Sequence, residues 1–184
     1  IKMLKKFIKQ FTEDFNKEVL NNDSEKLDDL LSEIEIVKRN NKKIIIVGNG
    51  GSAAIASHFS VDMTKVVGIR AINFNEGSLL TCFSNDYGYQ NWVSKALEFY
   101  SEKGDLIILI SSSGKSENII NAAKKCNELK LNLITFSGFS KKNPLYELGK
   151  VNFCVESKSY NIIESTHQFW LLSIVDYLIY EKKN

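Results

Sequence analysis

The sequence predicts an α/β protein built on a largely parallel sheet with helices on both faces. Short apolar runs alternate with longer amphipathic runs along residues 41–184, which is the pattern of repeated βαβ units. Two of the short runs end in turns rich in glycine or serine. The 184 residues are 43% hydrophobic and 25% charged, with a net charge of +2, which is typical of an ordinary globular protein.

The alternation predicts the elements in chain order. Residues 1–40 carry apolar side chains at helical spacing, and Asn21-Asn22-Asp23-Ser24 interrupts them and offers N-caps, so two helices are expected there. Strands are expected at residues 43–47, 71–74, 105–110, 131–136 and 152–155. Helices are expected at residues 52–65, 90–101, 116–129 and 162–181. With one proline and no Ser/Gly-rich linker, we expect one domain over residues 1–184, made of a helical segment (1–40) and a core (41–184).

The composition argues against several classes of function. Basic residues form only short, scattered clusters, so no nucleic-acid partner is expected. No window approaches the roughly 18 consecutive apolar residues that span a membrane, and residues 1–20 mix Lys, Glu and Asp, unlike a signal peptide. The three cysteines lie far apart without C-x-x-C spacing, so we expect buried, reduced thiols in a cytoplasmic protein.

Two turns have the composition of an anion-binding site. The first follows the strand at residues 43–47 and reads Gly48-Asn49-Gly50-Gly51-Ser52. The second follows the strand at residues 105–110 and reads Ser111-Ser112-Ser113-Gly114-Lys115-Ser116. Each leads into a helix, whose N-terminus offers unpaired N–H groups and a favourable dipole to an anion. Ligands of open parallel sheets bind beyond the carboxyl ends of the strands, so function is expected in these turns, with a plain helix N-cap as the alternative.

Neither turn completes a nucleotide-binding motif. The Walker pattern would need a glycine where the chain has Leu109, and the dinucleotide fingerprint would need one where it has Ala53. A relaxed fingerprint permits that alanine, so a nucleotide-dependent enzyme stays an alternative. The main expectation is that the protein uses no nucleotide cofactor.

Each of the two histidines has an acid at helical spacing. His58 lies four residues before Asp62, and His167 lies three residues after Glu164. Such spacings place each pair on one helical face, where it suits either proton transfer or metal binding, with a surface contact as the alternative. A further acid, Asp86, lies in a turn-rich stretch after the second strand, as a helix cap or a ligand of sugar hydroxyls.

These residues resemble the sugar isomerase (SIS) domain family, and within it the phosphoheptose isomerases. The resemblance covers nearly the whole chain and is strongest in the two loops, around His58, and in Asn85-Asp86-Tyr87-Gly88. It implies a three-layer αβα sandwich with a five-stranded parallel sheet, N-terminal helices that build a homotetramer, and active sites between subunits. It also implies ketose–aldose isomerisation through an enediol(ate), from sedoheptulose 7-phosphate to D-glycero-D-manno-heptose 7-phosphate or on a closely related sugar phosphate.

The resemblance assigns roles to individual residues. Substrate-binding residues are expected at Asn49, Gly50, Ser52, Asp86, Ser111, Ser112, Ser113 and Ser116, with the last four on the phosphate. Catalytic residues are expected at Asp62, Glu164, His167 and His58. Asp62 or Glu164 would be the base that moves a proton between C1 and C2, and the histidines would handle hydroxyl protons. Some family members carry zinc at the corresponding positions, which makes the same four residues candidate ligands of Zn²⁺.

The sequence departs from the family pattern at named positions. Asp62 stands where the family usually has glutamate, Glu164 where it has glutamine, and Leu172 where it has a catalytic histidine. A carboxylate that is one methylene shorter is displaced by about 1.5 Å, which proton transfer would feel. Several interpretations stay open: Glu164 and His167 replace the missing histidine, the reaction or substrate differs, or the chain is a non-catalytic module that binds a phosphosugar or bridges protein partners.

Overall fold

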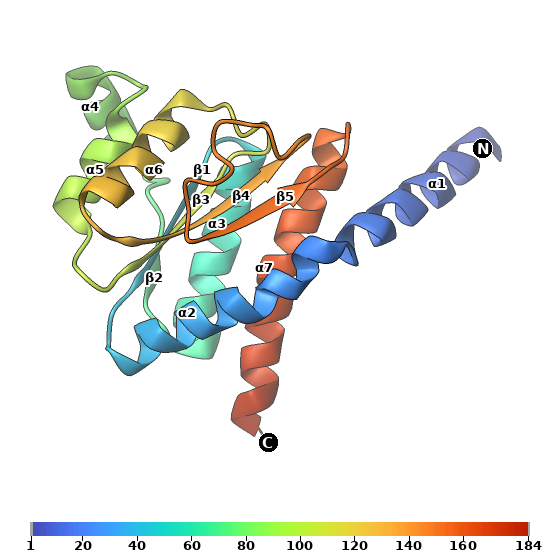
Figure 1. Ribbon diagram of the computed structural model, residues 1–184, viewed down its shortest axis with the longest axis horizontal. Coiled ribbons are helices and arrows are strands. Elements are labelled where there is room, and N and C mark those ends of the chain that lie inside the picture. The colour runs from blue at the N-terminus through green and yellow to red at the C-terminus, as the bar shows by residue number, and fades with distance from the viewer. Residues whose placement is uncertain (1, 184) are drawn as a thin grey trace.

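The computed structural model describes residues 2–183 and contains one five-stranded sheet (Figure 1). The strands are β1 Ile44–Gly48, β2 Ala71–Ile72, β3 Leu106–Ile110, β4 Asn132–Gly138 and β5 Val151–Val155. They lie in the order β2-β1-β3-β4-β5, and every neighbouring pair is parallel. The predicted α/β fold with a five-stranded parallel sheet is confirmed.

Helices cover both faces of the sheet, which makes a three-layer sandwich (Figure 1). One face carries α2 Leu27–Arg39, α3 Gly51–Asp62 and α7 Tyr160–Lys183, and the other carries α5 Trp92–Tyr100 and α6 Glu117–Glu128. The remaining elements are α1 Lys2–Val19, the 3-10 helix η1 Asn22–Lys26, the π-helix η2 Met63–Val67 and α4 Gly77–Tyr87. None of the helices in the described part of the chain has both the length and the apolar character that a membrane crossing needs.

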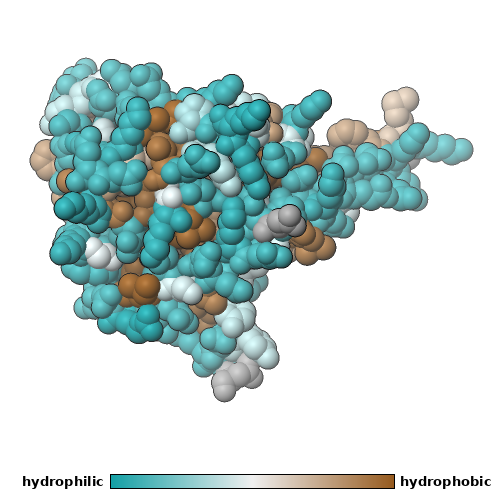
Figure 2. All heavy atoms as spheres, in the orientation of Figure 1, coloured by the Kyte–Doolittle hydropathy of each residue, from teal (hydrophilic) through white to brown (hydrophobic). Residues whose placement is uncertain are grey.

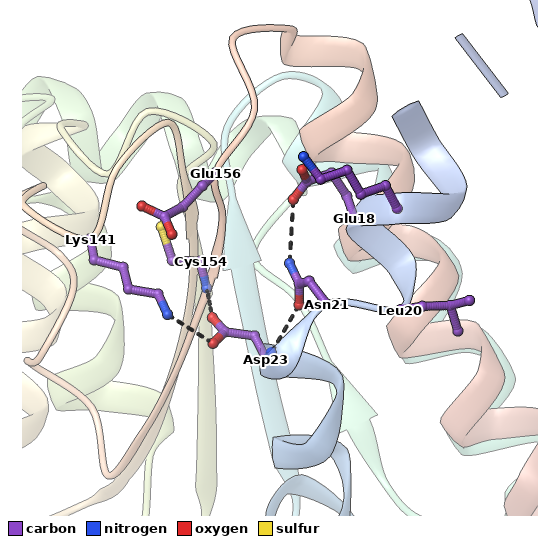
Figure 3. A pocket seen from close by; sticks show the side chains of 8 residues that line it. Glu18, Leu20, Asn21, Asp23, Lys141, Cys154 and Glu156 are labelled. Atoms are coloured by element: carbon purple, nitrogen blue, oxygen red, sulfur yellow. Dashed lines mark hydrogen bonds and ion pairs between the residues drawn. The ribbon is translucent and has the colours of Figure 1, made fainter. Parts of the chain in front are cut away.

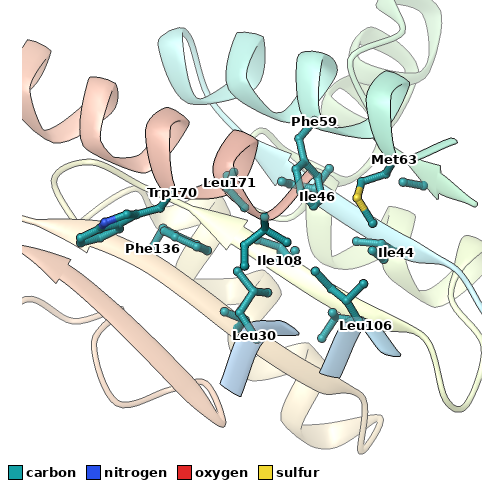
Figure 4. Close-up of a cluster of buried hydrophobic side chains, with 14 of the residues drawn as sticks. Leu30, Ile44, Ile46, Phe59, Met63, Leu106, Ile108, Phe136, Trp170 and Leu171 are labelled. Atoms are coloured by element: carbon teal, nitrogen blue, oxygen red, sulfur yellow. The ribbon is translucent and has the colours of Figure 1, made fainter. Parts of the chain in front are cut away.

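Side chains that alternate along the strands divide the core into two clusters. Ile44 and Ile46 of β1 face α2, α3 and α7, whereas Ile45 and Val47 face α5 and α6. Figure 4 shows the first cluster, in which side chains of α3 and α7 meet those of β1 and β3. Strands that are buried on both faces read as continuous apolar runs, and the sequence located all five strands to within two residues at each end.

The structure differs from the sequence-based expectation between β2 and α5. Residues 77–87 form α4, where only a turn-rich stretch was expected. Glu76 starts this helix because its carboxylate accepts hydrogen bonds from two backbone N–H groups of the first turn. None of its residues is fully buried, although Leu79, Leu80 and Phe83 pack partly against the core cluster on the α5 and α6 side of the sheet. It also leaves Cys82 exposed, so the expectation of buried thiols is wrong there and confirmed for Cys126 and Cys154.

The N-terminal part of α1 extends away from the sheet and its covering helices (Figure 1). The C-terminal end of α1 is held by α7, because the Trp170 indole donates to the Val19 carbonyl at 3.0 Å and Phe15 packs edge-on against Phe169. Four apolar side chains near the N-terminus are more than half exposed: Met3 (85%), Leu4 (63%), Phe7 (63%) and Ile8 (55%). Figure 2 shows apolar side chains on this extension. No residue between 2 and 183 covers them enough to bury them.

Candidate functional site at the carboxyl edge of the sheet

The two loops singled out in the sequence lie side by side at one edge of the sheet. β1 and β3 are neighbours in register, with Gly48 opposite Ile110, so the turns that follow them leave the sheet together. The first turn leads into α3 and the second into α6, and neither helix has a side-chain cap on its first turn. The unpaired N–H groups of both helix N-termini are therefore available to a ligand at this edge.

Two asparagines join the loops. The side-chain amides of Asn49 and Asn118 exchange two hydrogen bonds, at 2.9 and 3.0 Å. The Tyr89 hydroxyl donates a third hydrogen bond to Oδ1 of Asn49, at 3.2 Å. Asn49 was expected to bind sugar, and the structure shows that its amide also holds the two loops together. The sequence analysis assigned no role to Asn118, although an asparagine in the first turn after an anion loop was a usable signal.

The serine loop and the first loop together line a cavity of about 180 Å³. The polar residues that line it are Asn49, Ser52, Ser111, Ser112, Ser113, Ser116, Tyr160 and Glu164. Ser111 donates to the Ser116 hydroxyl at 2.9 Å, and the hydroxyls of Ser52 and Ser112 are 3.3 Å apart. Within the described residues no Lys or Arg lines this cavity. An anion there would therefore be held by hydroxyl and N–H donors of this chain.

The geometry of the first loop favours glycine at two positions. Gly50 has a φ of +55°, which lies in the left-handed region that favours glycine. A Cβ on Gly51 would lie 2.2 Å from Oε2 of Glu164. Gly51 therefore allows the Glu164 carboxylate to lie directly against the first turn of α3, where the helix dipole favours negative charge.

Glu164 lies between two cavities of the site. Its Oε1 accepts a hydrogen bond from the Ser112 hydroxyl at 3.1 Å. Its side chain lines both the serine cavity and a second cavity of about 360 Å³. His58 of α3 and Gln168 of α7 also line this second cavity. The two cavities are thus the two ends of one polar site, with the Glu164 carboxylate between them.

His58 and Asp62 form the predicted pair on one face of α3. Nε2 of His58 lies 3.2 Å from Oδ2 of Asp62, and the two side chains are 50% and 30% exposed. His58 faces the second cavity, whereas Asp62 lies one helical turn further along α3. The predicted contact is confirmed, and its part in catalysis stays a prediction. The arrangement lets a carboxylate orient an imidazole at the rim of the site.

His167 does not join the site, which corrects the expectation that it acts beside Glu164. Its side chain is fully buried, its ring packs edge-on against Phe136, and Nε2 lies 2.9 Å from the Ser137 carbonyl. A carbonyl only accepts, so Nε2 carries the proton, and Nδ1 has no partner among the described residues. Burial lowers the pKa of His167 to about 4. Side chains three residues apart on a helix point in directions about 60° apart. On α7 this difference is enough to turn Glu164 toward the site and His167 toward the sheet.

The four candidate zinc ligands do not come together. His58 and Asp62 are in contact, Glu164 lies across the second cavity, and His167 is in the core. Leu172 lies in an apolar groove between α1 and α7. Within residues 2–183, no group of three or more His, Cys, Asp or Glu side chains is placed to hold a metal ion. These residues therefore do not fit a zinc site.

Asp86 lies on α4 and bonds within its own helix. Its carboxylate accepts hydrogen bonds from the Asn85 amide at 3.0 Å and from the Cys82 thiol at 3.7 Å. Tyr89, three residues further on, is the side chain of this segment that reaches the first loop. The expected contact between Asp86 and the sugar stays a prediction.

A separate cavity of about 430 Å³ lies where α1, η1 and β5 meet (Figure 3). Asp23 at this cavity is 3% exposed and already has partners. It accepts hydrogen bonds from Lys141 at 3.2 Å and from the backbone N–H of Cys154 at 2.7 Å, and it pairs with Lys26 at 3.0 Å. Burial raises the pKa of the Cys154 thiol to about 11, so the thiol stays protonated. The contacts of Asp23 fasten the helical segment to β5, which is a structural role.

The fold and the site define an α/β protein with a polar site at the carboxyl edge of a parallel sheet, between two helix N-termini. The chain belongs to the SIS domain family, because the family model for the SIS domain matches residues 6–138. This confirms the resemblance inferred from the loops.

Relatives in the family carry a consistent name. The phosphoheptose isomerase of Aliarcobacter butzleri is 37% identical over 135 residues, which is 70% of this chain and 71% of the relative. That of Campylobacter concisus is 33% identical over 144 residues, 74% of this chain and 75% of the relative. The structure of the phosphoheptose isomerase from Neisseria gonorrhoeae has a TM-score of 0.86 at 27% identity, and the match covers 96% of this chain and 99% of that one.

Proposed function

We propose that this protein interconverts sedoheptulose 7-phosphate and D-glycero-D-manno-heptose 7-phosphate, or a closely related pair of sugar phosphates, through an enediol(ate) intermediate. The observation that supports this most is the position of Glu164, whose carboxylate lies between the serine cavity and the cavity at His58. The phosphoheptose isomerases among its relatives support the choice of substrate. Heptose biosynthesis in the cytoplasm is the proposed setting.

The serine loop would hold the phosphate. Its hydroxyls and the N–H groups at the start of α6 supply donors without a bound cation. With the phosphate there, the open sugar chain would run past Glu164 toward the cavity at His58. This orientation brings carbons of the sugar near the carboxylate of Glu164 and the imidazole of His58, which line the same cavity.

The reaction moves one proton between C1 and C2 and a second between the two oxygens. In our proposal Glu164 removes the carbon-bound proton and returns it to the neighbouring carbon. His58, oriented by Asp62 at 3.2 Å, transfers the hydroxyl proton. Positioned acids and bases of this kind contribute about 10²- to 10⁴-fold each. Because the residues do not fit a zinc site, no step is assigned to a metal.

The direct test is turnover by the purified protein. Aldose formation from sedoheptulose 7-phosphate is followed with added zinc and with a chelator. Glu164→Gln keeps an acceptor for Ser112 but removes the base, so kcat should fall by about 10²- to 10⁴-fold while ligand binding persists. Glu128→Gln, which removes a carboxylate from a surface ion pair with Lys125, is the matched control and should retain full activity. No turnover from folded protein under either condition would contradict the proposal.

A second candidate function is a non-catalytic module that binds a phosphosugar. The burial of His167 and the apolar surroundings of Leu172 favour it. At neither of these two positions of α7 does a histidine reach the site, although the family resemblance led us to expect one there. It predicts that phosphosugars raise the melting temperature without isomerisation. It also predicts that Asp62→Asn and Glu164→Gln leave binding intact, and turnover by the wild-type protein would exclude it.

We also propose that the protein assembles as a homotetramer, with sites completed between subunits. The support from this chain is the exposed apolar side of α1, where Leu4 and Phe7 are each 63% exposed. The α1 helix of a second copy is the occupant that fits this apolar face best, because identical amphipathic helices pack through the same stripe.

A further inference from the structure

Polar side chains continue along α7 beyond Glu164, on the face that packs toward α3. Gln168 lies one helical turn after Glu164, a rise of about 6 Å, and it lines the cavity of about 360 Å³ together with His58. Two turns after Glu164, the same face reaches Leu172 in the apolar groove, which Gln168 also borders. Gln168 therefore marks the boundary between the polar site and the apolar groove.

The carboxamide of Gln168 has no partner within the described part of the chain. The side chain is exposed, and it makes no hydrogen bond with any residue from 2 to 183. Glu164, in contrast, is held by Ser112 at 3.1 Å. A primary amide offers two N–H donors and one acceptor and carries no charge. It can hold a carbonyl or hydroxyl oxygen, but it does not exchange a proton as an acid or base would.

We propose that Gln168 binds the carbonyl end of the sugar phosphate, a role that rests on the isomerase function proposed above. A phosphate in the serine cavity directs the sugar past Glu164, so the oxygens on C1 and C2 reach the cavity that His58 and Gln168 share. An N–H donor at that oxygen stabilises the negative charge that develops on it in the enediolate. Leu172, one turn further on, has no polar atom to supply this contact.

The test compares Gln168→Leu with the wild-type protein on two ligands of different length. In the proposed orientation sedoheptulose 7-phosphate extends from the serine cavity into the second cavity, whereas the three-carbon chain of glycerol 3-phosphate stays in the serine cavity. The variant should lose about tenfold to hundredfold in kcat/KM on the long substrate, as for one hydrogen bond to a charged group, and keep its affinity for the short ligand. The pH dependence of kcat should keep its shape, because glutamine does not titrate. Gln168→Asn, which retracts the amide, should lose less.

Asn127→Leu is the control, because Asn127 is an exposed amide side chain near the C-terminal end of α6 and lines neither cavity. It should leave both ligands unaffected. If wild-type protein turns over and Gln168→Leu has the same kcat/KM, the assignment of Gln168 is overturned.

If the wild-type protein shows no turnover, the role of Gln168 is tested by calorimetric affinities for the two ligands. A selective loss of sedoheptulose 7-phosphate affinity in Gln168→Leu would support the role of Gln168 while the isomerase proposal fails. Equal affinities in the variant and the wild type, or no binding at all, would overturn the assignment.

Discussion

The side-chain amides of Asn49 and Asn118 bond to each other twice across the ends of β1 and β3, at 2.9 and 3.0 Å. The two residues are 69 positions apart in the chain, and their pairing fixes the distance between the first loop and the serine loop. A ligand that is held by both loops depends on that distance. The pair is therefore a structural support for the site.

Asn118→Ala should loosen the site and lower stability. It removes both hydrogen bonds and leaves the Asn49 amide with only Tyr89 as a partner, so the free energy of unfolding should fall by about 1–3 kcal/mol. Phosphosugar affinity should fall as well, which calorimetry would measure. Asn121→Ala, one turn further along α6, removes a single exposed hydrogen bond to Gln90 and should have a smaller effect. Equal effects from the two variants would argue against the support role.

Gly51→Ala should reduce activity more than stability. The added Cβ would lie 2.2 Å from Oε2 of Glu164, so the carboxylate must move, and a displacement of about 1 Å costs on the order of 100-fold in rate. The melting temperature should change little, because alanine is favoured in helices over glycine. Gly77→Ala is the control, since its added Cβ meets no atom within 4 Å. Full activity in Gly51→Ala would show that the position of Glu164 does not matter.

His167 should make the protein less stable as the pH falls. Burial lowers its pKa to about 4 in the folded state, against about 6.5 in the unfolded chain. Below pH 6.5 the unfolded chain therefore binds a proton that the folded protein excludes, so stability is lost as the pH falls from about 6.5 toward 4. Between pH 7 and pH 5 the loss should be about 2 kcal/mol, measured by urea unfolding.

The other histidine of the chain provides the control for this pH dependence. His167→Gln can still donate to the Ser137 carbonyl but does not titrate, so its unfolding free energy should lack this part of the pH dependence. His58→Gln changes a half-exposed side chain and should keep the pH dependence of the wild-type protein. The same slope in His167→Gln as in the wild type would contradict the assignment of His167 to the core.

Phe7→Glu should dissociate the proposed assembly. Phe7 lies in the exposed apolar part of α1, and a buried charge there would oppose contact between copies. Light scattering after size-exclusion chromatography would measure the mass. Lys9→Glu is the control, because a residue two positions after Phe7 lies about 200° around the helix and Lys9 is 80% exposed, so the mass should stay unchanged. An unchanged mass in Phe7→Glu would show that α1 does not hold the copies together.

The sequence by itself determined the parallel α/β sheet, the two loops and the contact between His58 and Asp62. These features depend on local patterns. Buried strands appear as continuous apolar runs, and glycine and serine after a strand mark a loop that leads into a helix. Side chains four residues apart on a helix are neighbours. The prediction missed α4, although Leu79, Leu80 and Phe83 lie at helical spacing, because the helix is short and its end at Ser84-Asn85-Asp86 has the composition of a turn.

Only the tertiary structure decided which way the side chains of α7 point. Glu164 lies against Gly51 in the site, whereas His167, three residues later, lies against Phe136 in the core. Helical spacing limits them to neighbouring directions, but the packing of α7 on the sheet and on α3 chooses which direction is the site. The same packing places Gln168 at the second cavity and Leu172 in an apolar groove. Long-range contacts therefore determine where the polar face of α7 ends.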